Sequence, residues 1–103
     1  PIANYEGYYA SVFYAFFASL GLDINVEASS NPGRLDMVMR FQGQVTIFEF
    51  KLVGDAPDGS ALRQIKEKDY AAPYRGQGEP IHLIGIEFSK TQRALLSWEV
   101  ETV

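Results

Sequence analysis

The stretch VTIFEFKL, residues 45–52, is predicted to be a strand, and the rest of the fold is predicted outward from it. It is rich in the β-branched and aromatic residues that favour strands, and two charges, Glu49 and Lys51, stand at alternate positions in it. Residues two apart on a strand project to the same side, so we expect Glu49 and Lys51 on one face and Phe48 and Phe50 on the other. Charges among such apolar neighbours are costly unless they are paired or bound to a metal ion.

The preceding stretch, residues 34–42, is predicted to be the antiparallel partner of this strand. A two-residue type II′ turn at Gly43-Gln44 would join the two, because that turn prefers glycine at its first central position. Counting back from the turn gives two pairs: Asp36 opposite Lys51, and Val38 opposite Glu49. Asp36, Glu49 and Lys51 would then share one face. The other face would be a core face made of Leu35, Met37, Met39, Phe41, Phe48, Phe50 and Leu52.

The whole chain is predicted to be one α/β domain, residues 1–103, with the order α-β-β-β-α-β-β. Asn4 and Ser60 are predicted to cap the two helices, which Gly21 and Pro73 would end. The expected helices cover 4–20 and 60–72, and the expected strands cover 22–26, 34–42, 45–52, 81–88 and 94–100.

The first predicted helix is apolar on nearly all sides. A stripe at helical spacing predicts its buried face: Tyr5, Tyr9, Val12, Phe13, Phe16 and Leu20. Tyr8, Tyr14 and Phe17 fall outside that stripe. A helix that is apolar all round is buried on more than one face, which indicates a second neighbour or a homodimer contact. Aromatic side chains that are simply exposed are the alternative.

Composition limits the class of protein. The 103 residues hold nine Lys and Arg against thirteen Asp and Glu, a net charge of −4, which argues against holding DNA by bulk electrostatics alone. The absence of cysteine excludes disulfide and zinc–thiolate scaffolds, and the single His82 excludes a multi-histidine metal cage. No apolar run reaches membrane-spanning length and no signal-peptide pattern opens the chain, so we expect a cytoplasmic module without membrane contact. Since the first residue is Pro1, we also expect a fragment of a longer protein.

The charged face allows two explanations from the residues alone. In one, Asp36 and Lys51 form a structural ion pair beside an exposed Glu49, which is the better explanation of an isolated cross-strand charge pair. In the other, Asp36 and Glu49, about 5–7 Å apart, share one cation.

Several segments together resemble the PD-(D/E)XK nuclease superfamily. Asp36 is followed thirteen residues on by Glu49-Phe50-Lys51, with Glu6 on the helix upstream and Gln64 on the helix downstream. The order of elements is similar to that of the family's restriction-endonuclease-like core, a central mixed sheet flanked by helices. The resemblance covers almost the whole chain and is nearest to the nuclease-like domain at the C-terminus of bacterial AAA-type ATPase-like proteins.

The resemblance implies roles for these residues. Asp36 and Glu49 would bind Mg²⁺ or Mn²⁺, with the main-chain carbonyl of Phe50 as a further oxygen ligand. Glu6 would act directly or through a water, although a glutamate in the first turn of a helix is equally explained by the helix dipole. Lys51 would orient the attacking water or stabilise developing charge, and Gln64 would complete the catalytic set.

Three positions depart from the family or carry weaker roles. Leu35 replaces the proline of the family name, and Lys68 stands where the exonuclease-like branch has a tyrosine, four residues after Gln64. Lys68 and Arg34 are candidates to contact nucleic-acid phosphates, although an exposed helical lysine is usually only solvated.

The function predicted first is therefore metal-dependent hydrolysis of phosphodiester bonds in nucleic acid, with DNA as the expected substrate. The alternative is a catalytically inactive nuclease fold that serves as an interaction module on an ATPase-like protein. A third hypothesis is a structural α/β domain with an incidental ion pair.

Overall fold

The computed structural model describes residues 5–28 and 35–103, with side chains described for 9–25 and 37–103. It is an α/β fold of five strands and two helices in the predicted order. The elements are α1 (Tyr5–Ser19), β1 (Asp23–Ala28), β2 (Leu35–Phe41), β3 (Gln44–Val53), α2 (Ser60–Glu67), a short 3₁₀ helix η1 (Ala72–Tyr74), β4 (Ile81–Ser89) and β5 (Ala94–Thr102).

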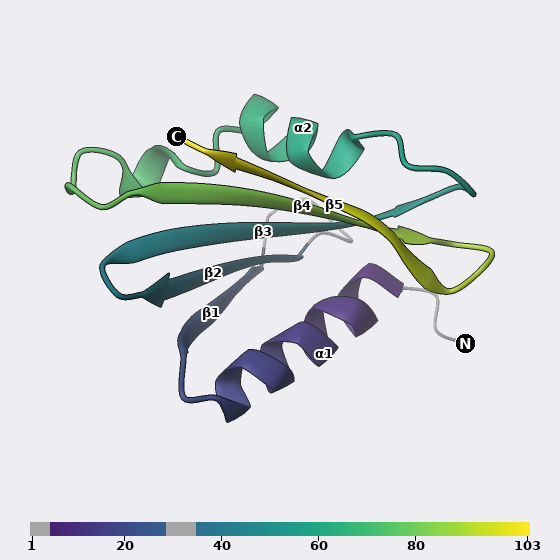
Figure 1. Ribbon diagram of the computed structural model, residues 1–103, viewed down its shortest axis with the longest axis horizontal. Coiled ribbons are helices and arrows are strands. Elements are labelled where there is room, and N and C mark those ends of the chain that lie inside the picture. The colour runs from purple at the N-terminus through teal and green to yellow at the C-terminus, as the bar shows by residue number, and fades with distance from the viewer. Residues whose placement is uncertain (1–4, 29–34) are drawn as a thin grey trace.

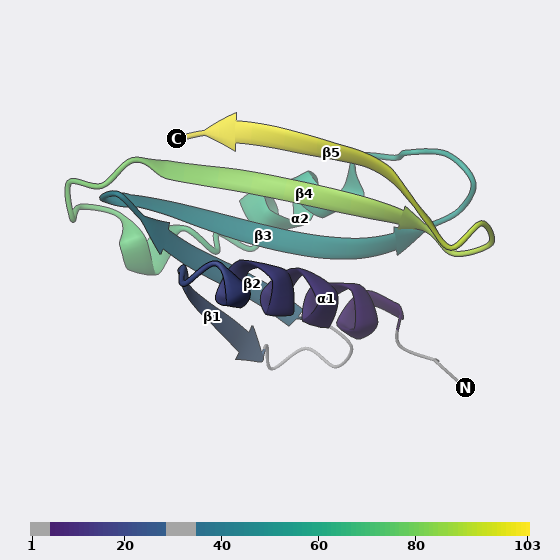
Figure 2. The ribbon, with the colours of Figure 1, turned by 60° about the horizontal axis from the view of Figure 1, so that its bottom comes forward.

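The strands form one mixed sheet in the order β1-β2-β3-β4-β5. β3 and β4 are parallel, and the other neighbours are antiparallel. A parallel connection needs a crossover, which α2 provides between β3 and β4. Figure 1 shows α1 on one side of the sheet and α2 on the other, and Figure 2 shows α1 lying across its own face.

Each face of the sheet has its own hydrophobic core. The core under α1 contains three phenylalanines and consists of Ala10, Ile24, Met37, Phe48, Phe50, Ile86 and Phe88. The core under α2 is mainly aliphatic and consists of Val38, Val45, Ile47, Ile65, Ala71, Ile81 and Leu83. The predicted division of the hairpin into a Phe face and a Glu49 face is thereby confirmed for the described side chains. Phe41 is the exception, since it is 49% exposed at the end of β2.

The predicted register of the hairpin was wrong by two residues. The turn consists of Gln42 and Gly43, both with positive φ (51° and 73°), as a type I′ turn requires. Phe41 therefore pairs with Gln44, and Asp36 pairs with Glu49 instead of Lys51. Because the shift is an even number of residues, each side chain keeps its predicted face.

The predicted buried stripe of α1 was also wrong in part. Phe17, which was placed outside the stripe, packs on the core together with Tyr9 and Phe13. Phe16 and Leu20, which were placed inside it, are each 60% exposed. Since the helix is apolar on nearly every side, spacing alone could not select the face that meets the sheet.

The second helix is shorter than predicted and begins differently. α2 ends at Glu67, and Asp69, at φ 53°, turns the chain out of the helix before Pro73 enters η1. Gly59, not Ser60, is the N-cap residue, and its position lacks a side-chain cap. The first N–H groups of α2 are bonded instead by the side chain of Asp58, just before the helix, and by a residue of a distant strand that is part of the site.

Candidate active site

β3 supplies two charged side chains to the face covered by α2. Glu49 lies in the middle of the strand and is 1% exposed, whereas Lys51 is half-buried. A carboxylate removed from water to this extent needs a compensating charge or donors, since the desolvation of an ion is costly. The alternative explanation, in which Glu49 is exposed beside an ion pair, is therefore wrong about the exposure of Glu49.

Asp36 stands at the register position opposite Glu49. Its side chain lies outside the described part of the chain, so its predicted role stays a prediction. In the described part of the chain the pairing of β2 with β3 runs from this pair to Phe41 and Gln44, and β3 lies beside β4 as far as Val53. Phe50, the predicted carbonyl ligand, follows Glu49 on β3 and pairs with Ile86 of β4.

Lys51 and Gln64, predicted as members of one site, are in contact. Nζ of Lys51 donates a hydrogen bond of 2.9 Å to Oε1 of Gln64, and the contact is partly buried. This bond joins β3 to α2 directly. It also selects a rotamer for the lysine, whose ammonium would otherwise have several choices on its flexible stem.

Gly85 explains how α2 comes close enough for this bond. Gly85 pairs with Glu49 in the parallel register, and a Cβ atom built on it would lie 2.4 Å from the main-chain nitrogen of Leu62. No side chain fits in that space. The missing side chain on β4 lets the backbone of α2 approach the sheet and carries Gln64 to Lys51.

Glu87 lies on the same face of the sheet as Glu49 and Lys51, although it was not among the predicted site residues. It pairs with Lys51 in the parallel register and is 1% exposed. Its Oε1 accepts a hydrogen bond from the main-chain N–H of Asp58 (2.9 Å), and its Oε2 accepts one from that of Ala61 (3.4 Å). A signal was present in the sequence, because Glu87 interrupts the apolar run LIGIEF, residues 83–88, much as Glu49 interrupts its own strand.

Three further residues were predicted for the site: Lys68, Glu6 and Arg34. Lys68 is the C-cap residue of α2 and has an exposed side chain. Glu6 belongs to the first turn of α1, which begins near the end of the sheet where β3 and β4 terminate (Figure 1). The side chain of Glu6 and the whole of Arg34 lie outside the described residues.

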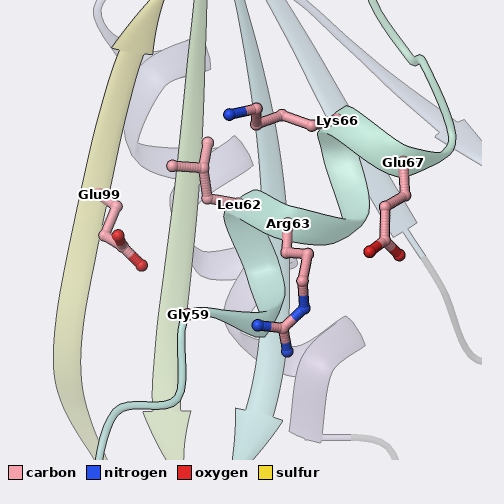
Figure 3. A pocket seen from close by; sticks show the side chains of 6 residues that line it. All are labelled: Gly59, Leu62, Arg63, Lys66, Glu67 and Glu99. Carbon is pink, nitrogen blue, oxygen red and sulfur yellow. The ribbon is translucent and has the colours of Figure 1, made fainter.

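The opposite flank of α2 forms a shallow hollow toward β5. Figure 3 shows its lining, Gly59, Leu62, Arg63, Lys66, Glu67 and Glu99. Lys66 forms an exposed ion pair of 3.0 Å with Glu101 of β5. Gln64 is absent from this lining, so the hollow is separate from the Lys51–Gln64 contact.

The residues fit a small, hard cation. Among the side chains that the structure describes, no three His, Asp or Glu gather into a metal-binding group. Magnesium does not require such a group, because it is commonly held by one or two carboxylates with waters and substrate phosphate. A buried Glu49 with an aspartate opposite it in the register matches that limited donor set.

Comparison with known proteins settles the family. Residues 4–98 match the sequence model of the PD-(D/E)XK nuclease superfamily. The chain belongs to this superfamily. Its mixed sheet with helices on both faces is consistent with the restriction-endonuclease-like fold of the PD-(D/E)XK nucleases. These nucleases typically use divalent metal ions.

A relative from Azotobacter chroococcum mcd 1 is 54% identical over all 103 residues. Its name is "Uncharacterized protein in vnfD 5'region". The chain spans 20% of the length of that relative. Within the described part of this PD-(D/E)XK domain, no helix combines the length and the apolar character that crossing a membrane requires.

Proposed function

We propose that this domain is a metal-dependent nuclease that hydrolyses phosphodiester bonds in nucleic acid, with DNA as the first expected substrate. The observation that carries the proposal is the bond from Lys51 to Gln64 beside the buried Glu49. A structural ion pair between Asp36 and Lys51 explains the arrangement less well, because the register pairs Asp36 with Glu49.

In this proposal Asp36 and Glu49 hold one Mg²⁺ or Mn²⁺ ion, and the Phe50 carbonyl is a third oxygen ligand. Glu6 contributes from α1, directly or through a water. When bound, the ion supplies Lewis-acid chemistry, which lowers the pKa of water and offsets phosphate charge. The two carboxylates and Lys51 together give a site that accepts both a cation and an anionic substrate.

Lys51 and Gln64 act on the substrate side of the site. In the proposal the Lys51 ammonium donates to a non-bridging phosphate oxygen, whose negative charge grows as water attacks phosphorus and the P–O bond to the leaving group breaks. Gln64 accepts one of the three ammonium protons and leaves the others for substrate and water. Arg34 and Lys68 are proposed phosphate contacts away from the reacting bond.

The test is cleavage of labelled single- and double-stranded DNA and of RNA, with Mg²⁺ or Mn²⁺. Glu49→Gln keeps the volume of the buried side chain and removes its charge, and Asp36→Asn does the same on β2. Each should reduce cleavage by at least about 10²-fold, because the metal supplies several kcal/mol of transition-state stabilisation. Glu101→Gln on β5 is the matched control. Cleavage that persists in Glu49→Gln would contradict the assignment.

A second candidate function is favoured by a separate observation, an apolar surface over α1 and β5. Val12, Phe16 and Trp98 are 50%, 60% and 65% exposed, and a hollow between the two elements is lined by Phe13, Ile84, Ile86, Leu95 and Trp98. Apolar groups gathered in this way are typical of protein contacts. The domain would then be an interaction module that binds an ATPase-like domain or a second copy of itself. Cytoplasmic location stays a prediction under both candidates.

A further inference from the structure

Glu87 is a buried carboxylate that the proposed reaction does not use. Only 1% of its surface is exposed, and it lies on β4, next to the strand that carries Glu49 and Lys51. Burial of a carboxylate is costly unless its oxygens receive hydrogen bonds. Those bonds come from the chain segment that leads into α2.

Both oxygens of Glu87 accept main-chain hydrogen bonds at the start of α2. Oε1 accepts from Asp58, in the loop, and Oε2 accepts from Ala61, in the first turn of the helix. The first N–H groups of a helix have no partner within the helix and usually bond a local cap. Gly59 offers no side chain for this purpose; Oδ1 of Asp58 accepts the N–H of Ser60, and Glu87 on β4 accepts those of Asp58 and Ala61. A negative charge is also favourable at this end of a helix.

The same helix start determines the position of Gln64. Gln64 follows Ala61 by three residues, about one turn, so any movement of the first turn is passed on to it. Gly85, two residues before Glu87 on β4, removes the side chain that would block the approach. Glu87, together with Asp58, thus holds the start of α2 in place, and Gly85 lets the helix lie close to β4.

We propose that Glu87 is a positioning residue for the nuclease site: by holding the N-terminus of α2 it aligns Gln64 with Lys51, and through them the lysine ammonium with the scissile phosphate. This inference rests on the proposed nuclease function. Glu87 itself touches neither metal nor substrate in the proposal, since both of its oxygens face the main chain of residues 58–61.

The test combines kinetics with nuclear magnetic resonance on the 103-residue chain. Glu87→Gln keeps the shape and one acceptor oxygen, and Glu87→Ala removes both acceptors. Glu101→Gln is the control, because it removes an acidic partner of α2 on the other flank, at Lys66. Amide exchange at Asp58 and Ala61 reports the hydrogen bonds of Glu87, and the Lys51 ¹⁵Nζ and Gln64 side-chain amide signals report their contact.

We expect both Glu87 variants to shift the Lys51 and Gln64 signals and Glu101→Gln to leave them unchanged. In Glu87→Ala, kcat should fall by up to about 10²-fold, as for a misplacement of about 1 Å at a reacting group, with KM within about twofold. Glu87→Gln should recover part of that loss. Combining Glu87→Ala with Gln64→Ala should cost little more than the larger single effect, because the two residues act in series.

Other results overturn the inference. If Glu87 only stabilises the fold, its variants will lower Tm while the Lys51 and Gln64 signals and kcat stay as in the wild type. If the two single effects multiply in the double variant, Glu87 does not act through Gln64. If the wild-type chain cleaves nothing, the proposed nuclease function fails. Lys51 and Gln64 signals that stay unchanged in the Glu87 variants would separately reject a positioning role of Glu87. If Glu87→Ala does not fold, Glu87→Gln alone decides.

Discussion

Lys51 of β3 and Gln64 of α2 are joined by a hydrogen bond of 2.9 Å from Nζ to Oε1. The bond crosses from the sheet to the helix that covers it, next to a glutamate that is almost completely buried. A lysine held in this way presents its remaining protons in defined directions. The proposed chemistry depends on this arrangement.

Removal of the Lys51 ammonium should reduce catalysis more than stability. We expect Lys51→Met to lower kcat by about 10²–10³-fold, the range for loss of one preorganised donor. Lys51→Arg should not restore activity, because a planar guanidinium does not replace a compact ammonium. Steady-state cleavage assays with Lys66→Met as the control measure this. Equal losses in Lys51→Met and Lys66→Met would point to nonspecific attraction for nucleic acid instead.

Gly85 should tolerate no side chain. In Gly85→Ala the new Cβ would meet the backbone of Leu62 at 2.4 to 2.8 Å, so α2 must move away from β4. Overpacking of this kind costs about 1–3 kcal/mol, and we expect the Lys51–Gln64 contact to be lost as well. Gly54→Ala is the matched control, because nothing lies within 4 Å of its Cβ position. Denaturant unfolding of both variants checks this, and similar stabilities for the two would show that α2 is not packed as described.

The exposed side chains of α1 and β5 should contribute little to folding. Phe16→Ser and Trp98→Ser should change the free energy of unfolding by no more than about 0.5 kcal/mol, the usual range for surface positions. Sedimentation of wild type and variants at high concentration tests the homodimer form of the interaction module. Self-association that both substitutions abolish would support it, whereas a wild-type monomer would leave an ATPase-like partner as the form to test by direct binding.

The turn after α2 should be sensitive to acid through Asp69. A hydrogen bond from Arg75 holds the pKa of Asp69 below its ordinary value, with a coulombic contribution from the same guanidinium. Because the pKa is lower in the folded chain, the ionised carboxylate favours folding above the unfolded-state pKa, and this contribution is lost as pH falls through the folded value. Asp69→Asn keeps the preference for positive φ and removes the charge. Its Tm should lie slightly below that of the wild type at pH 7 and should coincide with it in acid; a difference that stays constant with pH would contradict this origin.

Much of the fold follows from local patterns. The alternation in residues 45–52 predicted both faces of β3 correctly, since a strand has a period of two whatever its partner. The pairing was harder to predict, because turns at Gln42-Gly43 and at Gly43-Gln44 both place a glycine at a positive φ. The choice between the two turns shifts the register by two residues. It changes the partner of Asp36 but leaves every side chain on the same face of the sheet.

The parts that could not be predicted depend on tertiary contacts. The buried face of α1 is selected by the aromatic side chains of the sheet, such as Phe88, whose ring stacks on Tyr9 at 3.7 Å. Part of the cap of α2 comes from Glu87, twenty-six residues after Ala61, so the sequence could single out Glu87 as a charge in an apolar run but could not show which N–H groups it binds. Gln64 was selected because of the resemblance to the PD-(D/E)XK family; the structure shows its contact with Lys51, and its catalytic role stays a prediction.

In the proposed site Glu49 holds a divalent metal ion. Calorimetric titration of Mn²⁺ and Mg²⁺ into the purified chain tests it without knowledge of the substrate, with Glu49→Gln and the control Glu101→Gln beside the wild type. We predict saturable binding to the wild type and to Glu101→Gln, and loss of that binding in Glu49→Gln. Equal binding in all three proteins, or none in the wild type even with a phosphodiester analogue present, would contradict the claim.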